Sequence, residues 1–412
     1  MKTDLDRLMK KADLDALLVF GPTSHNAAMA YFMGLHHLST GYLIKPRGGE
    51  AVHFHNPMER EEAAASGLRT LSMYDYGQWD VFEQSGGNAI HADAVMLERI
   101  LKDFKIEGRV AVYGQAETGF IWSVLNQLSE RVPQVQLVGE NLNKSVLMQA
   151  RVTKDEDEIE RIRAMGRITV AVVADVAAYL TAHDVQDGFL VDRNGEQLTV
   201  GKIKQKINLW LAMRGADNPE GTIFAIGRDG GIPHSAGKDE DLVPVGQPIV
   251  FDIFPCEGGG GYFFDFTRTW CLGYAPEEVA QLHGQVLEVY QAVHDSIAVG
   301  AACRDYQVQT CELFEAMGHP SVLSDPKTQI GYPHSLAHGL GLNVHESPVF
   351  SILESNQDTL LPGTVFTLEP GLYYPERGMG VRLEDTLAIH PDGRLETLVE
   401  YPKDLVLKMP AM

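Results

Sequence analysis

Basic side chains are the scarce charge in this sequence of 412 residues. Lys and Arg number 34 against 56 Asp and Glu, which gives a formal net charge of −22. Because no long basic run offsets that charge, the sequence is unsuited to nucleic acid or an anionic membrane surface. No unbroken apolar stretch reaches the roughly 18 residues that span a bilayer, and the N-terminal segment lacks the apolar core of a secretory signal. We expect neither a nucleic-acid nor a membrane partner.

Cysteine is also scarce. The four cysteines are Cys256, Cys271, Cys303 and Cys311, and no two of them form a Cys-x-x-Cys pair. That pattern is typical of free thiols in a reducing compartment, not of a disulfide framework or a thiolate metal site. The sequence therefore predicts a cytoplasmic protein with free thiols.

The chain is long enough for two domains, at roughly 100–200 residues per domain. In the first part, apolar strands alternate with helical patterns. The strands are expected at 15–21, in two pieces within 40–56, and at 109–114, with a helix at 94–104. Such alternation predicts a layered α/β domain over residues 1–152.

A long helix is expected to open the second domain, residues 153–412. Thr153 and Glu156 have the spacing of a capping box, in which each side chain accepts a hydrogen bond from an unpaired backbone N–H. Apolar residues then recur at helical spacing from Ile159 to Tyr179. We interpret this helix as the link between the domains.

The remainder of the second domain is rich in strands, with two further helices near 276–300 and 305–317. Two strand pairs stand out. One joins 248–254 to 261–270 across a run of four glycines, and the other joins 363–374 to 378–390. Each predicted hairpin has one acidic residue on each strand. For the chain as a whole, the predicted fold class is a mixed one of helices and strands, α/β (α+β).

These four acidic residues lie inside strongly apolar runs, namely IVFDIF, FFDFT, FTLEP and VRLED; they are Asp252, Asp265, Glu369 and Glu384. A buried carboxylate is costly unless it is paired or bound to a cation. Four on neighbouring strands would repel one another, so a shared cation is the favoured interpretation. The alternative is that the carboxylates pair with Arg268 and Arg382.

Histidines form a second group. His234 lies in a loop flanked by Gly and Pro, and His334, His338 and His345 lie within one segment of twelve residues. One imidazole together with carboxylate oxygens suits a pair of Mn²⁺, Co²⁺, Fe²⁺ or Zn²⁺ ions. Histidines beside a carboxylate cluster also indicate a functional site.

Five blocks of sequence carry a resemblance. In order they are HSAG, D-I-F followed by GYFFDFTRT, AHGLGLNVHESP, TLEPGLY and GVRLEDT, and they extend from residue 234 to 386. This order resembles the pita-bread metallopeptidases: the prolidases, the Xaa-Pro aminopeptidases and the methionine aminopeptidases. SHNAAMAYFMG in the first domain is similar to the creatinase-type N-terminal domain of prolidases and aminopeptidases P, which methionine aminopeptidases lack.

The resemblance implies a dinuclear metal site. Asp252 would chelate one ion, His338 and Glu369 the other, and Asp265 and Glu384 would bridge both. Mn²⁺ is the expected metal, with Co²⁺, Zn²⁺ and Fe²⁺ as alternatives. A water or hydroxide between the ions would attack the scissile carbonyl.

The resemblance also implies roles in catalysis and substrate binding. Glu369 would transfer the proton, while His234 and His345 would bind substrate and stabilise the tetrahedral intermediate. His334 and Arg382 would lie in the substrate pocket or behind the ligands. The implied substrate is a peptide with proline at its second position, and the implied assembly is a homodimer.

Several alternatives stay open at this point. A prolidase-like Xaa-Pro dipeptidase is preferred over an aminopeptidase acting on longer peptides. A dipeptidase needs a cation for the proline carboxylate, and Arg382, Arg377 and Arg47 are candidates. A metal-free creatinase-like hydrolase and a non-catalytic binding module are disfavoured, because both tend to lose ligands. Asp252 and Asp265 are 13 residues apart (265 − 252), a longer hairpin than in many relatives, which affects the rim of the pocket.

Overall fold

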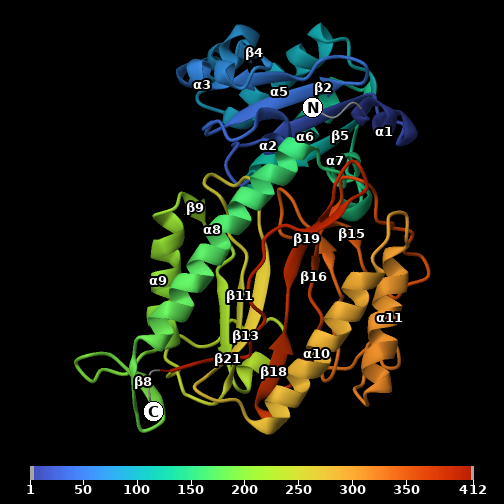
Figure 1. The fold of residues 1–412 in the computed structure, drawn as a ribbon. Helices are drawn as coiled ribbons and strands as arrows, with labels where there is room; N and C mark the ends of the chain where they lie inside the picture. The colour runs from blue at the N-terminus through green and yellow to red at the C-terminus, as the bar shows by residue number, and fades with distance from the viewer. Residues whose placement is uncertain (1–3, 410–412) are drawn as a thin grey trace. The chain divides into compact units, whose positions relative to one another are not determined.

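The structure is a computed structural model and describes residues 4–409 (Figure 1). The chain divides into two compact units. The first comprises the residues up to Arg151 together with Gly259–Gly261, and the second comprises Val152–Gly258 and the residues from Tyr262 on. Each unit has its own buried apolar core, so each is described by itself.

The N-terminal unit is built on one six-stranded sheet in the order β4-β3-β2-β1-β5-β6. β1 is antiparallel to β2 and parallel to β5, and apolar side chains on both faces of the sheet pack against helices. The strands and helix predicted in this part are present. The elements are α1 Leu5–Lys11, β1 Ala16–Phe20, α2 Ala27–Met33, β2 Gly41–Pro46, β3 Val52–His55, α3 Arg60–Ala65, β4 Arg69–Ser72, α4 Gln78–Gln84, α5 Ala89–Asp103, β5 Gly108–Gly114, α6 Thr118–Arg131, β6 Val135–Val138 and α7 Val146–Arg151.

An unpaired histidine is buried in this sheet. His53, in β3, has no exposed surface, and neither ring nitrogen has a hydrogen-bond partner within the described chain. Burial, followed by the charge of His55, lowers the pKa of His53 to about 4. An unfolded histidine titrates near about 6.5. The stability that depends on neutral His53 is therefore complete above about pH 6.5 and is lost as the pH falls towards 4.

We expect His53→Leu to make unfolding less sensitive to acid. A difference of about 2.5 pKa units corresponds to about 3 kcal/mol, the largest loss that protonation of His53 can cause. Urea unfolding at about pH 7.5 and about pH 4.5 measures the difference for wild type and variant. The exposed His37, replaced in the same way, is the control. An equal loss of stability in wild type and His53→Leu would show that this histidine is not responsible.

The C-terminal unit begins with helix α8, Glu156–Thr181. Its capping box is made by Asp155 and Glu158, whose side chains each accept a hydrogen bond from the other's backbone N–H. The prediction that Thr153 and Glu156 form this box was wrong. Thr153 instead pairs with Thr364 in a β-bridge, which holds it in extended backbone two residues before the cap.

By length and composition alone, helix α8 could cross a membrane. The sequence did not indicate this, because polar residues interrupt every apolar run in the helix. Core helices of soluble proteins pass the same test. One face of α8 is buried in the C-terminal unit, including Ile159, Ile162 and Val173. That burial accounts for the apolar residues of the helix, and the absence of a membrane partner stays a prediction.

Helices flank the strands of the C-terminal unit. Figure 1 shows α8 and α9 on one side and α10 and α11 on the other. A four-stranded sheet has the order β10-β11-β13-β21, and a five-stranded sheet has the order β15-β14-β16-β19-β20. The elements after α8 are β7 Asp184–Gln186, β8 Phe189–Val191, α9 Val200–Ala212, β9 Ala216–Asp217, β10 Thr222–Ile226, β11 Pro248–Ile253, β12 Cys256–Glu257, β13 Phe266–Leu272, α10 Glu277–Ser296, α11 Cys303–Ala316, β14 His338–Gly339, β15 Glu346–Val349, β16 Val365–Leu368, β17 Gly371–Tyr374, β18 Met379–Arg382, β19 Asp385–Ile389, β20 Leu395–Thr397 and β21 Val406–Leu407.

The two predicted hairpins exist, but three of the four acidic residues lie at the ends of strands and not inside them. The second hairpin is divided, since β16 pairs with β19 and β17 pairs with β18. Glu369 directly follows β16, and Glu384 directly precedes β19. In the first hairpin Asp252 lies within β11, whereas Asp265 comes just before β13. The expectation of one acid inside each strand was therefore wrong for three of the four.

Candidate metal centre

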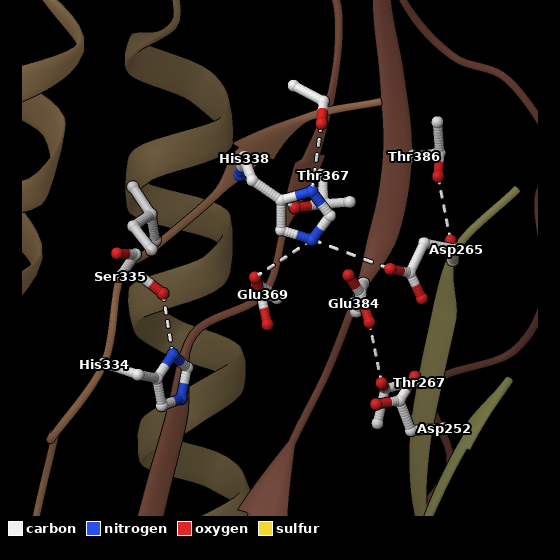
Figure 2. Close-up of polar contacts among 12 residues, drawn as sticks. Asp252, Asp265, Thr267, His334, Ser335, His338, Thr367, Glu369, Glu384 and Thr386 are labelled. Atoms are coloured by element: carbon white, nitrogen blue, oxygen red, sulfur yellow. Dashed lines mark hydrogen bonds and ion pairs between the residues drawn. The ribbon is translucent and has the colours of Figure 1, made fainter. Parts of the chain in front are cut away.

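The four carboxylates converge where the two large sheets of the C-terminal unit meet. The meeting point is a β-bridge between Thr267 and Glu384, in which the Glu384 N–H donates to the Thr267 carbonyl at 3.0 Å. Figure 2 shows Asp252 and Asp265 from the first hairpin facing Glu369 and Glu384 from the second. Residues far apart in the sequence thus form one cluster.

His338 completes the cluster. Its Nε2 lies 3.6 Å from Asp265 Oδ2 and 3.5 Å from Glu369 Oε1 (Figure 2). One donor atom each from Asp265, His338 and Glu384 lie within 4.8 Å of one another, a spacing that a single metal ion can span. The structure thus brings together all five residues predicted as ligands.

The hydrogen bonding of His338 leaves the correct nitrogen for a metal. Its Nδ1 lies 3.1 Å from the carbonyl oxygen of Gly339, which can only accept, so Nδ1 carries the proton. The lone pair of Nε2 then points at the carboxylates. Burial, followed by the charge of His345, lowers the pKa of His338 to about 3, which keeps the ring neutral. A neutral imidazole fixed through its other nitrogen is the usual metal-binding form.

The carboxylates are held in an unfavourable environment. Burial, followed by repulsion from neighbouring carboxylates, raises the pKa of Asp265 and of Glu369 well above the usual range. Burial and then Asp252 raise the pKa of Glu384 to about 8. A group of carboxylates with such pKa values stays ionised at neutral pH only with additional positive charge nearby.

The donors in this cluster fit metal ions. Asp252 Oδ1 and Glu384 Oε1 are buried without a hydrogen-bond partner in the described chain, so each has a lone pair for a cation. Arg382 Nη2 contacts Asp252 Oδ2 at 2.5 Å, and it is the one ion pair to Lys or Arg that the described residues give these four carboxylates. Arg268 pairs with Asp385 instead. Pairing with arginine, the alternative to a metal site, therefore holds only for Asp252. Oxygen donors together with one imidazole suit divalent transition metals.

A second group of residues lies beside the carboxylates. His334 Nδ1 donates to the Ser335 carbonyl at 2.7 Å, so its Nε2 accepts from the Tyr373 hydroxyl at 3.0 Å. The same hydroxyl oxygen accepts from Arg382 Nη1 at 2.7 Å. Tyr373 therefore connects His334 with the cluster. Sequence reasoning missed Tyr373, although the TLEPGLY block contains it.

His345 and His234 are both exposed, unlike the ligands. The ring of His345 lies 4.4 Å from the ring of His338, centroid to centroid. The charge of His234 contributes to lowering the pKa of both His334 and His345, after the larger effect of burial. His345 and His234 therefore lie near the cluster.

A buried ion pair supports the turn that carries His345. Lys154 Nζ and Glu346 Oε2 are 3.0 Å apart, with side chains 2% and 0% exposed. Glu346 Oε1 also accepts from the Asn343 N–H at 3.1 Å. The carboxylate fills the space beside Gly341, where a Cβ would lie 2.5 Å from Glu346 Oε2. Nothing in the sequence pattern indicated this pair.

The long loop of the first hairpin is anchored to helix α8. Arg161 forms two hydrogen bonds to Glu257, at 2.9 and 2.7 Å, and the Tyr262 hydroxyl donates to Glu158 at 2.6 Å. Tyr262 N–H also donates to Glu257. The extra residues between Asp252 and Asp265 are thus held at both sides of the glycine run, and the two aspartates still face one cluster.

The donor set defines a candidate metal-binding site, and comparison with known proteins identifies the family of the chain. Residues 160–391 match metallopeptidase family M24, and residues 3–141 match the creatinase/prolidase N-terminal domain. The chain belongs to metallopeptidase family M24. The predicted pita-bread fold with a creatinase-type N-terminal domain is confirmed.

Individual relatives show how far the likeness extends. A putative dipeptidase of Bacillus subtilis is 29% identical over 265 residues, which cover 64% of this chain but only 65% of that protein. The Xaa-Pro dipeptidase of Pyrococcus furiosus is 25% identical over 399 residues, 95% of this chain and 97% of that protein. The crystal structure of the X-Pro aminopeptidase from Thermotoga maritima superposes with a TM-score of 0.73 at 23% identity, over 97% and 99% of the two chains, which shows the shared fold.

Proposed function

We propose that the protein is a dinuclear metal-dependent Xaa-Pro dipeptidase, which hydrolyses the bond between an N-terminal residue and proline. The observation that carries the proposal is the convergence of the five donors, of which Asp252 and Glu384 each have one buried oxygen without a hydrogen-bond partner in the described chain. Membership of family M24 and the likeness to an Xaa-Pro dipeptidase over nearly the whole chain support it. Asp252, Asp265, His338, Glu369 and Glu384 would hold the ions.

Two divalent ions held by these five residues would supply Lewis acidity to the scissile carbonyl and would lower the pKa of a water molecule. The protein's own contribution begins with Glu369. Burial and then the charge of Glu384 raise the pKa of Glu369 in the metal-free chain, so its carboxylate is basic enough to take up the proton that the attacking water gives up. From there it can pass the proton to the proline nitrogen as the bond breaks, which is general acid catalysis.

The histidines act on the substrate side. His345 and His234 are exposed beside the cluster and can donate hydrogen bonds to the carbonyl oxygen as negative charge develops there. His334 stays neutral, because burial and then Arg382 lower its pKa to about 3. It is hydrogen-bonded to Tyr373, and its proposed role is to line the substrate pocket.

The choice between dipeptidase and aminopeptidase depends on the proline carboxylate. Each of the three candidate arginines already contacts a carboxylate: Arg382 contacts Asp252, Arg377 contacts Glu278, and Arg47 contacts Asp15. The preference for a dipeptidase therefore comes from the likeness to Xaa-Pro dipeptidase. An aminopeptidase acting on longer peptides is the alternative.

Turnover of Ala-Pro and Ala-Pro-Ala, measured in parallel with Mn²⁺, Co²⁺ and Zn²⁺, tests this choice. We expect hydrolysis of Ala-Pro and much slower hydrolysis of Ala-Pro-Ala, because a dipeptidase recognises the free carboxylate of proline. The tripeptide being the better substrate would reverse the assignment in favour of an aminopeptidase. Hydrolysis of neither peptide with any of the metals would overturn both.

Three further properties form part of the proposal. Mn²⁺ is the proposed metal, since oxygen-rich donor sets suit it. We place the protein in the cytoplasm, where its four free and buried cysteines fit a reducing compartment. We take it to be a homodimer, as the resemblance to prolidases implies.

A further inference from the structure

We infer that Arg268 and Asp385, a buried ion pair outside the ligand set, are positioning residues of the metal centre. They would fix the spacing between the strand that follows Asp265 and the strand that follows Glu384. This inference rests on the proposed function, because it assumes that these two acids hold metal. No role assigned above involves the pair.

The guanidinium of Arg268 is fully buried and uses all of its donors. Its five N–H groups donate to five oxygens, which is the complete capacity of an arginine. The acceptors are the carbonyls of Thr267 at 2.9 Å, Glu384 at 2.8 Å, Pro402 at 2.9 Å and Tyr401 at 2.9 Å, and Asp385 Oδ1 at 2.7 Å. A side chain satisfied in this way has one position only.

Two of these acceptors belong to the bridge that joins the sheets. Arg268 Nη1 donates to the carbonyls of both Thr267 and Glu384, the two residues of that bridge. The Thr267 hydroxyl also donates to Glu384 Oε2 at 2.7 Å, and Asp265 lies two residues before Thr267. A change in the guanidinium therefore alters the backbone that sets the distance between Asp265 and Glu384.

Asp385 connects this point to two further elements. Its Oδ2 accepts from the Tyr290 hydroxyl in helix α10 at 2.6 Å and contacts Lys403 Nζ at 2.5 Å. The ammonium of Lys403 in turn lies 4.6 Å from the centre of the Tyr290 ring. Helix α10 and the C-terminal segment are thus attached to the residue next to Glu384.

The C-terminal segment, which contains Tyr401, Pro402 and β21, supports the strand that follows Asp265. Tyr401 and Pro402 supply carbonyls to Arg268, and β21 pairs with β13 in parallel. The Cys271 N–H donates to the Leu405 carbonyl at 2.7 Å. This segment therefore holds the strand that follows Asp265 from the side opposite β11.

Metal binding by the full chain with Arg268→Lys tests the inference. Lysine keeps the charge but has no planar fork, so it cannot reach the five acceptors together. We expect the affinity for Mn²⁺ to fall by about 10–100-fold, the usual cost of losing a residue that orients a ligand. Calorimetric titration of Mn²⁺ into metal-stripped protein measures this affinity without any peptide substrate.

Val286→Ala is the matched control, because it opens a cavity in the buried face of α10 and removes no hydrogen bond or ion pair of Arg268 or Asp385. It should lower the melting temperature and leave the affinity for Mn²⁺ at the wild-type value. Wild-type affinity in Arg268→Lys, or a loss in Val286→Ala equal to that in Arg268→Lys, would overturn the inference.

A second variant protects the test against misfolding. Lys403 lies at the edge of the network with its side chain 22% exposed, so Lys403→Met is expected to fold. Its affinity for Mn²⁺ should fall by about tenfold, the lower end of the range for such residues, and unchanged affinity would contradict the inference. Failure of the proposed function gives a different result: wild type that binds two ions but hydrolyses no Xaa-Pro peptide.

Discussion

Asp265→Asn is expected to abolish hydrolysis of Ala-Pro. Asp265 lies 3.6 Å from His338 Nε2 and shares a candidate metal position with His338 and Glu384. The amide keeps the shape of the side chain but loses the negative charge that a shared divalent ion requires. Loss of one stabilising group of the oxyanion-hole type already costs about 10²–10³ in kcat, and we expect a loss of at least about that size here.

The control for this prediction is an acidic residue with the same substitution outside the cluster. Asp295, on α10, is exposed and contacts Gln291 and His294. Asp295→Asn should retain wild-type turnover, measured by steady-state kinetics, and wild-type metal content, measured by elemental analysis. Wild-type turnover of Ala-Pro by Asp265→Asn would contradict the assignment of the metal centre.

Lys154→Met is expected to destabilise the protein strongly. The substitution leaves the Glu346 carboxylate buried without its lysine, and removing one partner of a buried ion pair typically costs about 3–5 kcal/mol. Because Glu346 supports the turn that carries His345, turnover should fall as well. Urea unfolding of the wild type and variant measures the loss in free energy of unfolding.

Two comparisons separate burial from charge. Lys202→Met breaks an exposed pair with Glu196 and should cost less than about 1 kcal/mol. The double variant Lys154→Met with Glu346→Gln removes both charges and keeps an acceptor for Asn343, so it should regain most of the lost stability. An equal loss of unfolding free energy in Lys154→Met and Lys202→Met would show that the buried pair stabilises the protein no more than the exposed pair does.

The chemistry of the cluster was readable from the sequence, because carboxylates within apolar runs are costly and need a common explanation. The way the acids reach one another was not. Asp265, Glu369 and Glu384 lie where strands stop, and those interruptions depend on pairing between distant segments. Alternation of apolar residues continues through such a break and does not reveal it.

The residues that support the metal ligands also could not be predicted from the sequence. Arg268 looked like a partner for the ligands, yet it donates mainly to backbone carbonyls that only folding brings together. The start of α8 was misassigned for a local reason. TKDEDE contains both a Thr and an Asp three residues before a Glu, and the β-bridge of Thr153 decides between them.

The activity proposed for this chain is hydrolysis of Xaa-Pro bonds with two divalent ions. The most direct measurement is release of proline from Ala-Pro by metal-stripped protein as Mn²⁺ is added back. We expect no release at the start and a rate that rises until about two ions are bound per chain. Full activity in the stripped protein, or no activity at any Mn²⁺ concentration, would contradict it.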